Sequence, residues 1–525
     1  MSGNYLRLNI VYRYRNLFDI NFIIMIYNKT IIFSFLIGLV GTIGSAQTIT
    51  SKVVDKKTNQ PIPFATIQIS ENDGVITNEE GRFTIHMDQA NASADSIYIS
   101  SMGYEKIGIA VQPAIDSIIY IQPKAIELKS VYLSNKNYTI DEIMDKVEER
   151  LAQNYHFDMT QKRLFFRQSE FNTMKKLDVE FKKSTIEELN EEFIDSVITI
   201  IPRKSEYYIE TLCDYYGSVE KRKINIIKAA ELYDKNNSGS MEAMSEKLEK
   251  IFKDNVKPDS YLKIKSGLFG TKVQVDSILE QSEEAKAAKD EINDKKEEKS
   301  EFLKYRRMAI EGLFKNMFFQ EDPTVNFISK SGRYEFELID YTYMDDSSVY
   351  IINFSPKRRE DFKGTIYVNT EDFAIMRVDY TNVKNLRNFR LLGLSYQENL
   401  YKGTTIFTKG QDNKYTVKYL EKIKGNLFGV DRPLKVIEKN KHVKGKRKQN
   451  ELSLEIDAGI GNVSKYEIVV FDSKSLTETD YNGSIENKSI RPEYLSRYNP
   501  EFWKGYNIIE PNAAIKQFTV APESE

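Results

Sequence analysis

The sequence predicts an α+β protein with a small β-sandwich first, a helical middle next and a large antiparallel sheet last. Three observations support this order. Between residues 48 and 123, apolar and polar residues alternate as they do in short, half-buried strands. Helix-type spacing and dense charge follow. After Pro323 the alternation returns, over about ten strands, which predicts a large antiparallel sheet, curved or folded into an open half-barrel.

The composition is that of a folded protein. The 525 residues are 41% hydrophobic and 12% aromatic, which excludes a wholly disordered or collagen-like chain. Lys and Arg number 75 against 77 Asp and Glu, a formal charge of −2, so no overall positive field attracts nucleic acid. One cysteine cannot form an internal disulfide, and three histidines can fill few metal or catalytic positions. We therefore expect no nucleic-acid partner.

The first 46 residues are predicted to be a signal peptide and leader. Lys29 precedes an apolar run at 31–44, and Gly44-Ser45-Ala46 supplies small residues for cleavage. The apolar run is about 14 residues, where a membrane span needs about 20. We expect Gln47 to begin a mature chain without a stable transmembrane span, periplasmic or secreted, with outer-membrane association left open. Met25 is the alternative start, because the residues before it lengthen the leader.

Residues 47–123 are predicted to form the β-sandwich. Apolar residues at 65, 67 and 69, and again at 83, 85 and 87, alternate with polar neighbours. Gly, Pro, Asn and Asp mark the reversals between these segments, as in Asn72-Asp73-Gly74. Six or seven short strands in this length indicate a sandwich.

Four segments of this region form a recognisable set: Val53-Val54-Asp55, 61–67 (PIPFATI), 77–83 (TNEEGRF) and 95–104. Together they resemble the carboxypeptidase regulatory-like domain family, which occurs in secreted proteins of Bacteroidetes-type bacteria. The resemblance implies a prealbumin-like, carbohydrate-binding-like fold without catalysis of its own. The order of sandwich, short helix and long mixed region is also similar to a group of uncharacterised envelope proteins of these bacteria.

Residues 124–137 are predicted to be a linker, and 138–322 a mixed α+β region with a charged helix. Thr139 and Glu142 have the spacing of a capping box, which predicts a helix to about Gln153. We expect strands from 164 onward, interrupted by a helix near 186–193, then two helices around a polar turn across 228–256. Residues 273–311 are expected to be helical. Of the 25 residues in 283–307, 16 are charged, which is typical of a solvated helix or a flexible insertion.

Residues 323–525 are predicted to form the antiparallel β domain, with turns at 369–372 and 411–413. The segment 364–378 is similar to strands of bacterial lipoprotein-carrier-like half-barrels. Trp503 lies in an aromatic tail that we expect to dock back on the sheet. Three groups of residues show the alternation: Tyr334, Phe336 and Leu338; Met376, Val378 and Tyr380; and Leu452, Leu454 and Ile456.

The search for catalytic, cofactor-binding and metal-binding residues assigns none. His86, His156 and His442 are far apart and belong to no HExxH motif. Gly459-Ile460-Gly461 lacks the third glycine of a dinucleotide fingerprint. Cys213 lies in a predicted strand without a neighbouring His or basic residue, as expected of a buried structural thiol.

Residues 234–245 (DKNNSGSMEAMS) resemble part of a calcium-binding EF-hand loop. Oxygen donors stand at loop positions one, three and five, with glycine at six. The twelfth position is Ser245, with Glu246 one residue late. A tight turn between helices is therefore the favoured interpretation.

The leading hypothesis is a non-enzymatic, secreted or periplasmic envelope protein that binds a macromolecular or amphiphilic ligand. The partner is an envelope protein, a glycan or a lipid, and no cofactor is expected. One alternative is a lipid or lipoprotein carrier with an open half-barrel, for which the many aromatic residues could line a groove. The other is a hydrolase with a carboxylate site. The sequence leaves open the ligand, the oligomeric state, a cavity in the C-terminal sheet and the role of the charged segment 283–307.

Overall fold

The fold is mostly β: of the residues that the structure describes, 53% are in strands and 19% in helices. The predicted signal peptide, most of the predicted linker and residues 283–296 lie outside the described residues. Among the helices of the described ranges, none is long and apolar enough to cross a bilayer. The computed structural model describes residues 47–70, 73–87, 96–111, 115, 117–124, 138–276, 297–344, 347–440, 442, 444 and 447–520.

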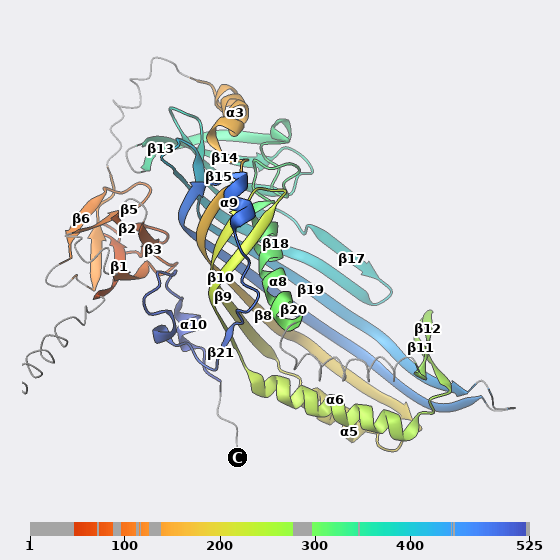
Figure 1. The fold of residues 1–525 in the computed structure, drawn as a ribbon. Coiled ribbons are helices and arrows are strands. Elements are labelled where there is room, and N and C mark those ends of the chain that lie inside the picture. The colour runs from red at the N-terminus through yellow and green to blue at the C-terminus, as the bar shows by residue number, and fades with distance from the viewer. Residues whose placement is uncertain are drawn as a thin grey trace, which may run out of the picture. The chain divides into compact units, whose positions relative to one another are not determined.

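The N-terminal region is a β-sandwich-like domain of two small sheets (Figure 1). One sheet has the order β4-β1-β7 and the other β3-β2-β5-β6. The predicted alternation is confirmed, since Ile67, Phe83 and Ile85 are fully buried. The strands are β1 (Gln47–Asp55), β2 (Thr66–Ser70), β3 (Asp73–Ile76), β4 (Arg82–Met87), β5 (Ser96–Ser100), β6 (Ile107–Ala110) and β7 (Ile118–Ile121).

A single 14-stranded sheet contains the remaining strands. Its main path is β13-β14-β15-β16-β18-β19-β20-β8-β9-β10-β21, with β17 paired to β18 and the β11–β12 hairpin paired to β19, so the sheet is open. The strands are β8 (Thr160–Ser184), β9 (Lys204–Gly217), β10 (Arg222–Tyr233), β11 (Ser260–Ser266), β12 (Phe269–Gln274), β13 (Tyr334–Met344), β14 (Ser347–Pro356), β15 (Phe362–Asn369), β16 (Ile375–Asn382), β17 (Arg387–Leu391), β18 (Leu394–Lys409), β19 (Tyr415–Asn440), β20 (Lys448–Ser475) and β21 (Glu493–Leu495).

The middle of the chain and its C-terminal part share this sheet. β8 pairs antiparallel with β20 along its whole length, from Thr160 opposite Ser475 to Ser184 opposite Leu452. β9 and β10 continue the sheet beyond β8. The strands before and after Pro323 therefore belong to one layer, visible as the long arrows in Figure 1.

The predicted helical middle is wrong in two places. Residues 228–233 are the end of β10, and residues 273–274 are the end of β12 in the β11–β12 hairpin. In place of the two helices expected across 228–256, the structure has one, α6. Asp234 caps the N-terminus of α6 by accepting a hydrogen bond from Asn236 N. The helices are α3 (Ile140–Glu149), α4 (Leu151–Asn154), α5 (Glu191–Ile200), α6 (Lys235–Asn255), α8 (Glu297–Phe314), α9 (Glu478–Gly483) and α10 (Ala513–Gln517), with short 3-10 turns η1 (Ser331–Arg333) and η2 (Pro500–Trp503).

Helix α8 is not simply solvated, as its charge had suggested. Leu303, Ile310 and Leu313 recur at helical spacing and are buried in the main hydrophobic core, which they share with β8, β9 and β10. Arg306 lies on the same face and is 3% exposed. The charged residues of 297–307 therefore include one that faces the core, and α8 covers part of one face of the sheet.

The capping box, the two turns and the aromatic tail are confirmed, whereas the helix expected near 186–193 begins only at Glu191. Thr139 and Glu142 form the reciprocal capping box of α3. The turns at 369–372 and 411–413 join β15 to β16 and β18 to β19. Trp503 is 1% exposed and packs edge-on against Phe165 of β8, so the aromatic tail does dock on the sheet.

Candidate functional site

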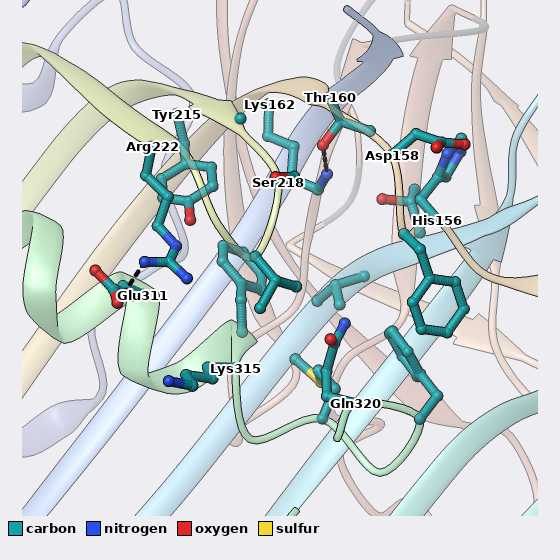
Figure 2. A pocket seen from close by; sticks show the side chains of 18 of the residues that line it. His156, Asp158, Thr160, Lys162, Tyr215, Ser218, Arg222, Glu311, Lys315 and Gln320 are labelled. Atoms are coloured by element: carbon teal, nitrogen blue, oxygen red, sulfur yellow. Dashed lines mark hydrogen bonds and ion pairs between the residues drawn. The ribbon is translucent and has the colours of Figure 1, made fainter. Parts of the chain in front are cut away.

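A small pocket lies where the end of α8 meets the starts of β8 and β19 and the β9–β10 turn (Figure 2). Its volume is about 70 Å³. Gly217 makes the turn possible: its φ is +129°, and an added Cβ would lie 1.9 Å from Lys221 O. This turn brings Ser218 and Arg222 to the pocket wall.

Lys162 of β8 lies in this wall and is 9% exposed. Thr160, Lys162, Leu164 and Phe166 are all buried, because alternate residues of the strand point to the same face. The Lys162 ammonium donates to Thr160 Oγ1. Among the described residues, no carboxylate lies within ion-pair distance of it, and burial lowers its pKa to about 8.

Three other titratable groups of the pocket, Arg222, Glu311 and His156, have ion-pair partners. Arg222 lies 2.5 Å from Glu311 of α8, and Figure 2 shows this ion pair beside Lys162. His156 Nε2 lies 3.0 Å from Asp412. Burial lowers the pKa of His156 despite that carboxylate. Asp158 and Lys315, of opposite charge, also line the pocket but are exposed, so Lys162 is its buried cation without an ion-pair partner among the described residues.

Aromatic rings also line the pocket. Phe157, three residues before the start of β8, is 41% exposed and contacts Phe319 edge-on at 5.7 Å. Phe319 in turn stacks on Tyr155 at 4.5 Å. The site therefore combines a buried cation with aromatic rings, which suits a ligand that has an anionic end and an apolar remainder.

Two further cations are buried on the face of the sheet that α8 covers. Arg306 donates to Gln168 Oε1 at 3.0 Å and to the Phe166 carbonyl at 3.2 Å, and burial lowers its pKa to about 10. Lys422 of β19 is 8% exposed, and burial lowers its pKa to about 8. No ion pair joins either one to a carboxylate of the described ranges. Buried cations without such partners are costly and mark candidate binding sites.

A cluster of carboxylates elsewhere in the sheet is bridged by a lysine. Lys465 of β20 lies 3.0 Å from Glu421 and 3.2 Å from Glu467. Burial raises the pKa of Glu421 to about 7, with Lys465 opposing and Glu467 adding to the shift. An ammonium group therefore occupies the space between these carboxylates, where a glycosidase pair would need its substrate.

The histidines and the cysteine singled out from the sequence do not gather at one site. His86 lies on β4 beside Thr48, with 3.0 Å between its Nδ1 and Thr48 Oγ1. His156 lines the pocket, whereas His442 lies beyond β19. Cys213 is fully buried in β9. Within the described ranges, no cluster of three or more His, Cys, Asp or Glu could hold a metal ion.

The calcium-loop and turn interpretations of 234–245 are both wrong, because residues 235–245 are helical. Asp234 is the N-cap of α6, and the residues that would line a loop belong to the helix itself. Asp and Asn are common at helix N-caps, which explains the partial similarity to a calcium loop.

The sequence search missed Lys162 and Arg306. The sequence did contain a signal for each residue. Lys162 lies on the same face of its strand as Leu164 and Phe166. Arg306 lies on the same face of its helix as three apolar residues, Leu303, Ile310 and Leu313. A charged residue at an inward position of an apolar pattern is the observation that would have identified both.

Comparison with known proteins identifies the first domain. Residues 49–133 match the CarboxypepD_reg-like domain family, so the chain carries such a domain, and the match extends past residue 123. A search of curated proteins found no match.

Solved structures with a partial likeness include a putative outer membrane lipoprotein-sorting protein domain from Vibrio parahaemolyticus, at 7% identity and TM-score 0.18, covering 65% of this chain and 96% of that one. A LolA superfamily protein from Nitrosomonas europaea has 10% identity and TM-score 0.18, covering 65% and 95%. The Pseudomonas aeruginosa MucA/MucB complex has 6% identity and TM-score 0.14, covering 60% and 92%. With TM-scores this low, these likenesses carry no functional argument.

Proposed function

We propose that this is a non-enzymatic binding protein of the cell envelope, periplasmic or secreted, and that its pocket at Lys162 holds the anionic end of an amphiphilic ligand. The observation that carries the proposal is the buried Lys162 ammonium, which has no ion-pair partner among the described residues, in a pocket that aromatic rings also line. The leader pattern before Gln47 supports the location, and N-terminal sequencing of the exported protein tests it. The CarboxypepD_reg-like domain is assigned an attachment role.

An anionic group would offset the cost of burying Lys162. A carboxylate or phosphate beside the ammonium favours its charged form and returns its pKa toward the ordinary value. The pocket, at about 70 Å³, holds a head group rather than a whole lipid. The apolar part of the ligand would then lie against Phe157 and Phe319, which line the pocket.

The test uses dodecanoate and dodecanol, which share a chain and differ in charge. Calorimetric titration should show dodecanoate binding at least about tenfold more tightly, since a hydrogen bond to a charged group contributes about 1.5–3 kcal/mol. Lys162→Met should remove this preference. Lys315→Met is the matched control, because Lys315 lines the same pocket but is exposed. Unchanged dodecanoate affinity in Lys162→Met would refute the proposal.

The pH dependence provides a second test of the same site. The free Lys162 ammonium loses its proton near pH 8. Dodecanoate affinity should therefore decrease as the pH rises above about 8, while dodecanol affinity stays level. The same decrease in Lys162→Met would assign the effect to another group.

A carrier that encloses an acyl chain would need α8 to move. Rings already fill this face of the sheet: Phe327 stacks on Phe354 at 4.5 Å, and Phe318 contacts Phe407 at 5.8 Å. Native mass spectrometry of the purified protein separates the two proposals, because co-purified lipid favours the carrier. The carboxylates of Glu421 and Glu467 do not support the hydrolase alternative, because the Lys465 ammonium bridges them.

A further inference from the structure

Two β-hairpins on one edge of β19 end in exposed apolar residues. The tip of the β11–β12 hairpin carries Leu268, 90% exposed, and Phe269, 50% exposed. The tip of the β17–β18 hairpin carries Leu391, 51% exposed, and Leu392, 49% exposed. We call these four residues the apolar tips. Exposed leucine and phenylalanine concentrated at neighbouring tips are uncommon unless they contact a partner or a membrane.

The two tips meet at the same point of β19. β18 pairs with β19 up to Val430, and β11 pairs with it from Lys435 onward. Between these stretches, Asp431 N donates to Gly393 O at 2.7 Å. Arg432 donates to the Ser266 carbonyl and lies 4.8 Å from the centre of the Phe269 ring. Both hairpins stand at the same edge in Figure 1.

The turn of the second hairpin retains a leucine in a strained conformation. Leu392 has φ +47° and Gly393 has φ +81°, which is the geometry of a two-residue hairpin turn that usually carries Asn-Gly. In the left-handed region a leucine is disfavoured. An apolar side chain kept at such a position, half exposed, indicates a role at the surface rather than in folding.

The surroundings of the apolar tips are basic. Residues 260–274 contain Lys263, Lys265 and Lys272 and no acidic residue, although the whole chain is slightly acidic. The pKa of Lys263 is lowered chiefly by Lys265, which reflects the local density of positive charge. On the second hairpin, Arg390 is exposed beside Leu391. Acids near the hairpins include Asp431, which is exposed, and others that have partners: Asp457 pairs with Lys176, Glu398 lies 3.7 Å from Arg387, and Glu438 accepts from Ser260.

We infer that the apolar tips dock on the surface of an anionic lipid bilayer. The leucines and Phe269 enter the interface between head groups and acyl chains, while Lys265, Lys272 and Arg390 contact lipid phosphates. Insertion of apolar side chains combined with contacts from basic side chains to lipid phosphates is characteristic of interfacial membrane binding. The inference does not depend on the Lys162 pocket.

The test is flotation of the full chain with vesicles. The protein should float with an equal mixture of phosphatidylcholine and phosphatidylglycerol, more weakly with phosphatidylcholine alone, and less at high salt. The double variant Leu268→Ser with Leu392→Asn should lose about tenfold or more of the affinity. Lys265→Glu with Arg390→Glu should lose affinity only for the anionic vesicles.

Matched controls separate docking from general surface effects. Ile485→Ser removes an apolar side chain that is 79% exposed elsewhere, and Lys56→Glu reverses an exposed charge on the sandwich. Both should float like the parent protein, as should Lys162→Met. Leu392→Asn suits the turn, so its thermal midpoint should equal or exceed that of the parent. Its loss of binding therefore cannot come from unfolding.

Three results would overturn the inference. The first is a parent protein that does not float with the mixed vesicles, and the second is an apolar-tip variant that floats equally well. The third is a parent dimer, seen by sedimentation equilibrium, that the tip substitutions dissociate without changing flotation. That third outcome would identify the apolar tips as a self-association surface.

Discussion

Trp503 Nε1 donates a hydrogen bond of 2.7 Å to Glu210 Oε2, joining residues 293 positions apart in the chain. Both side chains are 1% exposed. The other Glu210 oxygen accepts from Arg167 Nε at 2.7 Å, and Arg167 also donates to the Ile509 carbonyl at 2.9 Å. The C-terminal tail is thus held on the sheet by a buried charge pair, in addition to apolar packing.

Glu210→Ala should be severely destabilising. The substitution leaves Arg167 buried with only Glu467, at 3.8 Å, as a carboxylate partner. Breaking a buried pair on one side costs about 3–5 kcal/mol. Trp503 is the only tryptophan, so urea unfolding followed by its fluorescence reports directly on this region. Glu493→Ala on β21 is the exposed control. If Glu210→Ala loses no more unfolding free energy than Glu493→Ala, the Arg167–Glu210 ion pair contributes little to stability.

Lys162→Met should stabilise the protein at neutral pH. The pKa of Lys162 in the folded state, about 8, lies below the ordinary value of 10.5, so the folded state disfavours the charged form. This cost is fully present below about pH 8 and disappears as the pH rises toward 10.5. The free energy of unfolding should increase by about 3 kcal/mol at pH 7, and the increase should vanish at alkaline pH. Urea midpoints measured across this range check it, with Lys315→Met as the control that should show neither effect.

Thr139→Ala should loosen the start of α3. The substitution removes the side-chain oxygen that accepts from Glu142 N and breaks the capping box. The expected cost is about 1 kcal/mol, whereas Thr139→Ser should retain most of the stability. Hydrogen exchange of the first-turn amides of α3 is the measurement. Equal protection in the Ala and Ser variants would mean that packing, rather than the cap, holds this end.

Cys213 should resist thiol reagents in the native protein. The side chain is fully buried, and desolvation raises its pKa well above the ordinary value. Labelling should be slower than in denaturant by at least about a thousandfold, because only unfolded molecules expose the thiol. Rapid stoichiometric labelling in native buffer would show instead that β9 opens locally.

Short-range signals were sufficient to predict much of the fold. The capping box at Thr139 was readable because its partners are three residues apart. The strand at Tyr334, Phe336 and Leu338 was readable because burial of one face imposes a period of two. The docking of Trp503 followed from its apolar surroundings, although its partner Glu210 did not.

The helical interpretations failed where helix propensity and tertiary pairing disagree. Residues 228–233 contain good helix formers, yet they pair with β9 from Tyr207 to Leu212. Likewise, residues 273–274 are strand because β12 pairs with β11, which pairs with β19 from Lys435 to Asn440. Sheet pairing with distant strands overrides local propensity at these positions.

The sequence by itself determined the sandwich, the alternating strands, the caps and turns and the lone buried thiol, since each depends on residues a few positions apart. Only the tertiary structure decided that 160–233 and 334–475 form one sheet and that Lys162 is buried with no carboxylate of the described residues within ion-pair distance. It also decided that the hairpin tips carrying Leu268 and Leu392 both lie beside Arg432. The physical reason is that burial and charge compensation depend on which distant strands pair, and loop closure between such strands leaves no periodic trace in the sequence.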